Sequence, residues 1–430
     1  MGEVTRTELF PYVFLTHLQT DKFKTNTLSI TLLSQLDRET AAKNAILPRV
    51  LLRGTEKYPD MECLAQELDE LYGTQIEQLV IKKGEIQCIE LYANFVDDRM
   101  LPEGEEIFEK VTDLLSEILL RPDKKVGKLR GDYVNSEREK LIDEIQGRIN
   151  NKTAYAIGRL SELMCDSEAF ATFRLGTEAE AETIEAASLT SHYQTLLETA
   201  PIEIIYSGRA DLEQVTEVLT KAFQDLPRGE IDLDLGTDVR MNSVAETARD
   251  FTEEMDVAQG QLSLGFRLGE CMEEPNYVAL DLFNYLYGGS VTSKLFLNVR
   301  ERLSLCYFAS SIIEKHKGLL FVISGIEFAK YEEAKAEILA QLEAIKTGDI
   351  TEEEFLWAKR AMSTDLAMLK DDQNTLQDFY LSQTILGEGD SIEEIIAKVE
   401  WVEKEDLVEI ANSLELDTVY FLKGAEEEGA

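Results

Sequence analysis

The chain has 430 residues, of which 44% are hydrophobic, so it can bury a sizeable core and is long enough for two to three domains. Its 83 acidic and 43 basic residues give a formal net charge of -40, which would repel phosphate backbones and anionic lipid surfaces. This composition argues against nucleic-acid and membrane partners, whereas basic peptides would be attracted.

The start of the chain carries no recognisable targeting signal. Residues 1–21 alternate polar and apolar side chains, without a basic segment followed by an apolar one. No apolar run approaches the roughly 20 residues that a membrane span requires. The five cysteines are widely spaced and form no CxxC pair, which favours reduced thiols. We therefore expect a cytoplasmic protein.

Strands and helices are expected in alternating blocks. Leu28, Ile30 and Leu32 alternate with polar residues, which predicts a half-buried strand over residues 27–32. Apolar spacing predicts a helix over 61–71 and another over 334–345, and Thr351 opens a capping box that starts a third. Further short strands are expected at 86–95, 202–206, 261–266, 319–324 and 419–422. The mixture favours the α+β class.

A weak internal repeat suggests two similar halves. A helical stretch at 183–197 precedes the strand at 202–206, and one at 395–411 precedes the strand at 419–422. Between them, residues 227–247 are polar and contain Gly229 and Gly236, as a linker would. We place the boundary near residue 235, within about ten residues, which predicts domains 1–235 and 236–430.

Three segments together resemble the pitrilysin/insulinase/mitochondrial processing peptidase (M16) family. They are the Leu-Pro-Arg stretch at 47–59, which contains Arg-Gly-Thr at 53–55, Arg-Leu-Gly-Thr-Glu at 174–178, and the Leu-Tyr-Gly-Gly to Leu-Cys-Tyr stretch at 286–307. The resemblance implies the LuxS/M16 metallohydrolase-like fold, with two similar halves that each pack helices on a mostly antiparallel sheet. Similar bacterial proteins are named for an association with modification of elongation factor P.

The zinc motif of that family is lost in this sequence. Active members carry an inverted motif, HxxEH, with two histidine ligands and a glutamate base. The matching positions are Ala45, Pro48 and Arg49, which offer a methyl group, a pyrrolidine ring and a permanent cation. Glu144 matches the third ligand, with Glu139 as the weaker match, and alone it is expected to be an ordinary solvated helix residue. We therefore expect no metal and no other cofactor on this chain.

No other catalytic motif is apparent. The three histidines, His17, His192 and His316, lie far apart and form no HxxH pair, and His192 is expected on a helix surface. The sequence contains no GxSxG, phosphate-binding loop or dinucleotide fingerprint.

The second half keeps features that the first has lost. Val291, Leu295 and Val299 recur every four residues, which predicts an amphipathic helix over 291–302, with Arg300 near its end and Tyr307 in the next strand.

The resemblance implies a substrate-binding role for this segment, which consists of Gly288, Gly289, Ser293, Arg300 and Tyr307. In the family's two-subunit members, an Arg and a Tyr at this spacing reach the zinc site and donate hydrogen bonds to substrate. Without the resemblance, an Arg at a helix end and a Tyr in a strand are ordinary structural residues.

The resemblance thus implies a non-catalytic subunit whose partner is an HxxEH-bearing peptidase subunit. Zinc is expected in that partner, and the substrate would be a peptide. Two alternatives stay open: a peptide-binding or scaffold protein, possible as a homodimer, and an independent hydrolase that uses another site.

Overall fold

The computed structural model describes residues 4–102, 105–243 and 245–424. Its contacts divide the chain into two compact units: unit 1 contains Met1–Gly147, Thr172–Gly236 and Asp372–Glu388, and unit 2 contains Arg148–Ala171, Thr237–Asp371 and Gly389–Ala430. The units therefore differ from the continuous halves 1–235 and 236–430, because each takes one segment from the other half of the chain.

Unit 1 is built on a six-stranded sheet. Only the β2–β8 pair is parallel; the other pairs in this sheet are antiparallel. In spatial order the strands are β1 (Val4–Phe10), β2 (Val13–Gln19), β8 (Ile202–Gly208), β3 (Thr25–Gln35), β5 (Ile86–Val96) and β4 (Gln75–Lys83).

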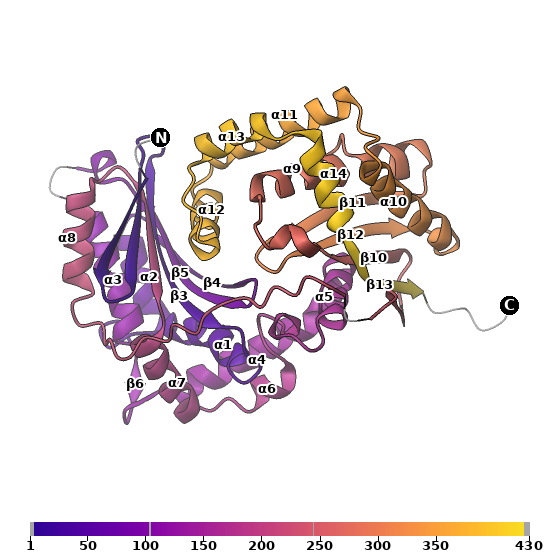
Figure 1. Cartoon of the computed structure of the whole chain (residues 1–430). Helices are drawn as coiled ribbons and strands as arrows, with labels where there is room; N and C mark the ends of the chain where they lie inside the picture. Colours follow the sequence, from indigo (N-terminus) through magenta and orange to yellow (C-terminus); the bar gives the residue numbers. More distant parts are fainter. Residues whose placement is uncertain (1–3, 103–104, 244, 425–430) are drawn as a thin grey trace. The chain divides into compact units, whose positions relative to one another are not determined.

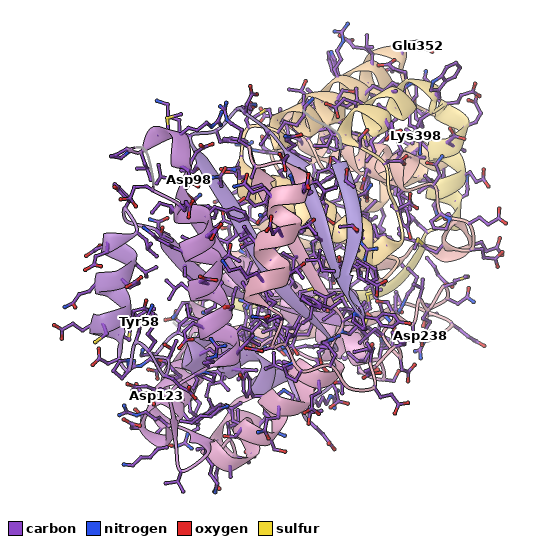
Figure 2. The ribbon with its side chains drawn as sticks, turned by 90° about the vertical axis from the view of Figure 1, so that its left-hand side faces the viewer. Tyr58, Asp98, Asp123, Asp238, Glu352 and Lys398 are labelled. Atoms are coloured by element: carbon purple, nitrogen blue, oxygen red, sulfur yellow. The ribbon has the colours of Figure 1, made fainter. Side chains whose placement is uncertain are left out.

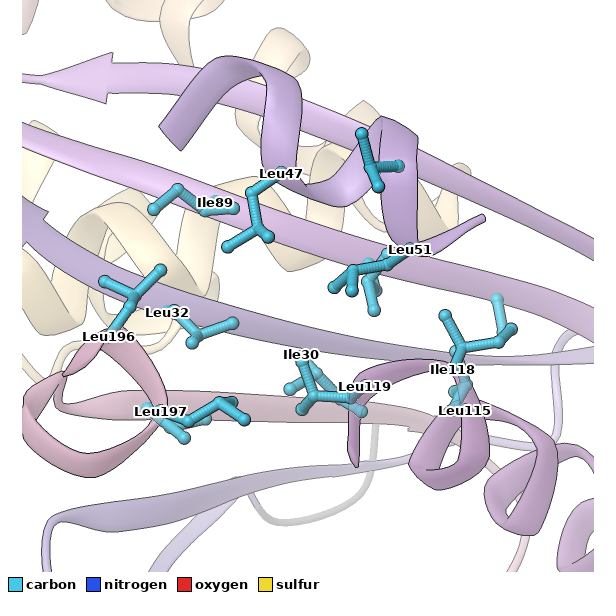
Figure 3. Close-up of a cluster of buried hydrophobic side chains, with 14 of the residues drawn as sticks. Ile30, Leu32, Leu47, Leu51, Ile89, Leu115, Ile118, Leu119, Leu196 and Leu197 are labelled. Carbon is cyan, nitrogen blue, oxygen red and sulfur yellow. The ribbon is translucent and has the colours of Figure 1, made fainter. Parts of the chain in front are cut away.

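The apolar face of this sheet is covered by helices from the first half of the chain. Leu28, Ile30 and Leu32 point into the core, as their alternation predicted. The strand is not half-buried, however, because the alternating residues Thr27, Ser29 and Thr31 are also buried, on the opposite face. Figure 3 shows Leu32 near Leu47 of α1 and Ile30 near Leu119 of α3, in the same buried cluster. The helices of unit 1 are α1 (Ala41–Leu51), α2 (Met61–Glu70), α3 (Ile107–Leu120), α4 (Gly131–Gly147), α6 (Glu178–Glu182), α7 (Ala186–Thr199), α8 (Leu212–Ala222) and α12 (Gln373–Leu386).

Helix α12 lies on the opposite, polar face of the same sheet (Figure 1). Gln373 Nε2 donates to the carbonyls of Thr25 and Ser207, and Gln377 Nε2 donates to Thr27 Oγ1 at 2.9 Å. This helix comes from the second half of the sequence, and glutamine side chains attach it to the sheet of unit 1.

Unit 2 has a five-stranded sheet of the same kind. Here β9 and β13 are parallel, and the other pairs in this sheet are antiparallel. In order the strands are β11 (Cys306–Glu314), β12 (Leu319–Ile326), β10 (Gly260–Arg267), β13 (Glu415–Gly424) and β9 (Arg249–Met255). The two mostly antiparallel sheets, each packed with helices, confirm the predicted α+β class.

One face of the unit 2 sheet receives α5, a helix from the first half of the chain. Leu160 and Met164 of α5 are fully buried against Phe321 and Leu422. A side chain at Gly265 would have its Cβ 2.6 Å from Met164 Sδ, so glycine permits this close approach. The helices of unit 2 are α5 (Lys152–Met164), α9 (Tyr277–Tyr287), α10 (Tyr331–Lys346), α11 (Glu352–Leu369), α13 (Ile392–Trp401) and α14 (Lys404–Ser413).

Charged side chains cover the outer helices. Figure 2 shows Glu352 and Lys398 on helices of unit 2, and the Glu352 side chain is 91% exposed. Within the described ranges, no helix combines the length and apolar character needed to cross a bilayer. All five cysteines lie within the described ranges, and none of them is in a disulfide bond.

Candidate functional site

Helix α1 carries the three degenerate metal-motif positions. Ala45 and Pro48 are buried in the core beneath the helix, and Pro48 lies inside the helix, where it offers no main-chain N–H. Neither side chain has a donor atom for a metal. The residues at these positions therefore do not fit a zinc ion.

Arg49 supplies a fixed positive charge where the motif would have a ligand. Its Nη2 lies 2.6 Å from Glu144 Oε2 on α4, and Arg174 Nη2 lies 3.9 Å from the other carboxylate oxygen. Glu144 lies on α4 with its side chain 44% exposed, as expected of a solvated helix residue, and the ion pair with Arg49 is the feature that the sequence did not predict. A guanidinium now binds the carboxylate that matches the third metal ligand. Across the part of the chain that the structure describes, no three His, Cys, Asp or Glu side chains are grouped as a metal site requires.

His192 is partly buried and belongs to a polar network beside α1, so it is not the surface residue that the sequence predicted. Its Nε2 donates to Asn44 Oδ1 at 2.6 Å, and Asn44 Nδ2 donates to Gln87 Oε1 at 2.8 Å. Gln87 in turn donates to the main-chain carbonyls of Ala41 and Arg174. Burial lowers the pKa of His192 to about 4, so the ring is neutral at pH 7. The apolar periodicity around residue 192 gave no signal of this network.

The glycine-rich segment of the second half forms a tight turn in unit 2. Gly288 packs on the edge strand β11, where its carbonyl accepts the Ser311 N–H at 3.1 Å and a Cβ would lie 2.6 Å from that nitrogen. A Cβ on Gly289 would lie 2.6 Å from Asn284 Nδ2. The Ser293 side chain is buried, and its Oγ accepts the Phe296 N–H, so it supports the turn; we expected it to bind substrate.

The helix predicted over 291–302 is shorter than expected and is a π-helix, Leu295–Arg302. Val291 lies outside it and is 70% exposed, whereas Leu295 and Val299 are buried as predicted. Lys294 is buried as well and pairs with Glu354 of α11 at 2.8 Å. This cation is therefore used inside unit 2.

Arg300 and Tyr307 remain on the surface of unit 2. The Arg300 side chain is 41% exposed and its guanidinium lies 4.7 Å from the ring centre of Phe296. Tyr307 is 61% exposed at the start of β11, where the pairing with β12 shifts register between Cys306 and Phe308. A β-bulge of this kind turns a side chain away from its regular direction.

The backbone that joins the two residues is irregular throughout. The π-helix that carries Arg300 is a rare form, the connecting Ser304 has φ 51°, and Tyr307 sits at the bulge. Positive φ at a residue other than glycine is unfavourable and persists only where its surroundings hold it. Such irregularities cluster at functional sites. Here they surround two exposed hydrogen-bond donors, the guanidinium of Arg300 and the phenol of Tyr307.

The fold and the altered motif define a peptidase-like protein that lacks the metal centre of a peptidase. The description "Peptidase M16 inactive domain" matches residues 183–362. The chain is 34% identical over 95% of its length, and 95% of the other's, to the "Probable inactive metalloprotease YmfF" of Bacillus subtilis. The chain therefore belongs to the M16 peptidase family, among its inactive members.

Two further similarities agree with this assignment. An "Uncharacterized zinc protease YmxG" of Bacillus subtilis is 28% identical over 38% of this chain and 40% of its own. The crystal structure of a conserved protein from Enterococcus faecalis V583 has a TM-score of 0.88 and 27% identity, with 100% of both chains covered. The predicted family and fold are confirmed, as is the prediction that the chain is not a peptidase by itself.

Proposed function

We propose that this chain is the non-catalytic subunit of a heterodimeric M16 zinc peptidase. In this proposal an HxxEH-bearing subunit supplies zinc, and Arg300 and Tyr307 of this chain donate hydrogen bonds to the peptide substrate. The main support is the irregular backbone of the π-helix and β11, which holds an exposed guanidinium and an exposed phenol. Both groups suit a carbonyl oxygen on which charge develops.

Two other observations support the pairing. Ala45, Pro48 and Arg49 cannot hold a metal, so hydrolysis requires a metal from elsewhere. In addition, Bacillus subtilis carries both a relative named inactive and one named a zinc protease. A cytoplasmic location is part of the proposal.

The test is co-expression with an HxxEH-bearing relative from the same organism. We expect a stable complex, zinc only in the partner, and cleavage of an extended peptide. Tyr307→Phe removes one hydroxyl and Arg300→Ala one guanidinium, and each should lower kcat/KM by about 10²-fold or more, because a preorganised donor is lost. Steady-state peptide cleavage by the purified complex measures the effect.

Arg302→Ala is the matched control, because Arg302 is an exposed arginine at the end of the same π-helix. It should leave kcat/KM unchanged. The proposal fails if no complex forms, or if the complex forms and both Arg300→Ala and Tyr307→Phe cleave like the parent. A homodimer that binds peptide without promoting cleavage would favour the scaffold alternative.

A further inference from the structure

Unit 1 contains two arginines that share one carboxylate. Arg49 Nη2 lies 2.6 Å from Glu144 Oε2, and Arg174 Nη2 lies 3.9 Å from Glu144 Oε1. Arg174 also donates from Nη1 to the Val80 carbonyl at 2.7 Å, which fixes its guanidinium beside the edge strand β4. The three charged groups therefore carry a net charge of about +1 in a chain whose formal net charge is -40.

The hydrogen-bonding capacity of this trio is not used up. Arg49 Nε is buried and has no acceptor among the described residues, and a buried donor without an acceptor is unfavourable. Burial lowers the pKa of Arg174, and the charge of Arg49 lowers it further, whereas Glu144 raises it. The lowered pKa of Arg174 thus reflects mainly its burial, and the Arg49 Nε donor is hydrogen-bonding capacity that the described residues leave unused.

Glu144 and Arg174 are open to solvent, unlike a neighbouring ion pair that joins the segment just after α1 to α4. Just beyond the end of α1, Arg53 pairs with Glu137 at 3.1 Å, but the Glu137 side chain is only 7% exposed. The side chains of Glu144 and Arg174 are 44% and 37% exposed. The Arg49 side chain is only 13% exposed. A ligand can therefore reach Arg174 directly and Arg49 at the exposed edge of its guanidinium, whereas Glu137 is closed off.

We propose that Arg49 and Arg174 bind the carboxylate of a peptide. A guanidinium presents its donors in a planar fork that matches the two oxygens of a carboxylate. One bound carboxylate would bring the site to two positive and two negative charges. The carboxylate comes from a peptide C-terminus or from an acidic side chain, since both present the same group.

The test uses the full chain alone, without a partner subunit or zinc. Acetylated tetrapeptide libraries of neutral residues are prepared as free acids and as C-terminal amides, and their retention is compared by equilibrium dialysis and mass spectrometry. We expect the acids to be retained about 10-fold more than the amides, because charge-assisted paired hydrogen bonds are worth about that factor. The chain as a whole repels anions, so such an excess requires a local site.

Variants assign the excess to the two arginines. Arg49→Gln and Arg174→Gln should each remove it, and Glu144→Gln should increase it, because the competing carboxylate is lost. The control is Arg138→Gln. Arg138 is also a charged residue of α4, but it donates to the Ile184 carbonyl and is not part of the proposed site. This variant should still retain the acids more strongly than the amides. Circular dichroism of each variant checks that it is folded.

A third library, of amides that contain one internal aspartate, separates the two sources. Its retention would assign the site to acidic side chains, and its loss would assign it to the C-terminus. Equal retention of acids and amides overturns the proposal, as does an excess that survives in both Arg49→Gln and Arg174→Gln. None of these results depends on Arg300 or Tyr307, so failure here leaves the two-subunit function standing.

Discussion

Replacement of Glu168 by glutamine is expected to destabilise unit 2 by about 3–5 kcal/mol, because it removes a buried carboxylate that compensates two buried cations. The Glu168 side chain is 2% exposed, and its oxygens lie 2.7 Å from Arg267 Nη2 and 2.8 Å from Lys317 Nζ. The side chains of Arg267 and Lys317 are themselves 0% exposed. The glutamine side chain would keep one acceptor oxygen but would lose the negative charge.

The cluster holds separate parts of unit 2 together. Arg267 of β10 also binds Asp417 of β13 at 3.1 Å, and Asp417 binds Arg249 of β9 at 3.0 Å. Glu168 lies just after α5, in the segment that comes from the first half of the chain. Its loss would therefore weaken the attachment of that segment as well as the sheet.

The same carboxylate makes the stability of unit 2 fall at acidic pH. Burial alone would raise the pKa of Glu168, but hydrogen bonds from Arg267 and Lys317 outweigh it and lower the pKa from 4.5 to about 2. A lowered folded-state pKa contributes stability that is complete above the unfolded value and is lost as the pH falls. The parent should therefore lose stability from pH 4.5 down to pH 2, and Glu168→Gln should lose less over that range.

Urea unfolding followed by tryptophan fluorescence isolates this effect, because both tryptophans, Trp357 and Trp401, belong to unit 2. Glu333→Gln is the matched control: its carboxylate is 61% exposed and pairs with Lys330 at 3.1 Å. That change should cost less than about 1 kcal/mol. If the two variants unfold at the same urea concentration, the buried cluster does not stabilise unit 2 as argued.

Local patterns explain why much of the fold could be predicted from the sequence. The strand at 27–32 lies within β3, and the capping box at Thr351 starts α11, with both reciprocal hydrogen bonds formed. Alternation and capping depend on neighbours within a few residues, which the sequence displays directly. The exchange of α5 and α12 could not be predicted in this way, because Gln377 and Thr27 lie 350 residues apart.

The candidate site shows the same difference between local features, which the sequence displays, and long-range contacts, which it does not. That Ala45, Pro48 and Arg49 cannot bind a metal follows from their chemistry alone. The partner of Arg49 is 95 residues away, and that of His192 is 148 residues away, so periodicity gave no indication of either pair. The helix around Arg300 was predicted with the wrong start, because apolar spacing does not distinguish a π-helix from an α-helix over two turns.

Acidification to pH 4 is expected to remove about 3 kcal/mol of stability from unit 1 through His192. Burial lowers the folded-state pKa of this ring from 6.5 to about 4, whereas the unfolded chain takes up the proton near pH 6.5. The unfolded state therefore binds more protons between these values, and stability falls as the pH falls from 6.5 to 4. The loss is complete only below pH 4, where the ring of the folded protein is protonated as well.

His192→Gln tests this titration, because glutamine can still donate to Asn44 Oδ1 but does not ionise in this range. Hydrogen exchange of the α1 amides, corrected for the intrinsic rate at each pH, reports unit 1 directly. The variant should show a smaller loss of protection between pH 6.5 and pH 4 than the parent.

His17→Gln is the control. His17 is buried in the same unit but bonds to the Ala210 carbonyl, so this variant should keep the pH dependence of amide protection that the parent shows. Equal acid sensitivity of His192→Gln and the parent would mean that other groups set the acid limit of α1. A reduced sensitivity would show that neutral His192 stabilises α1, the helix that carries Arg49.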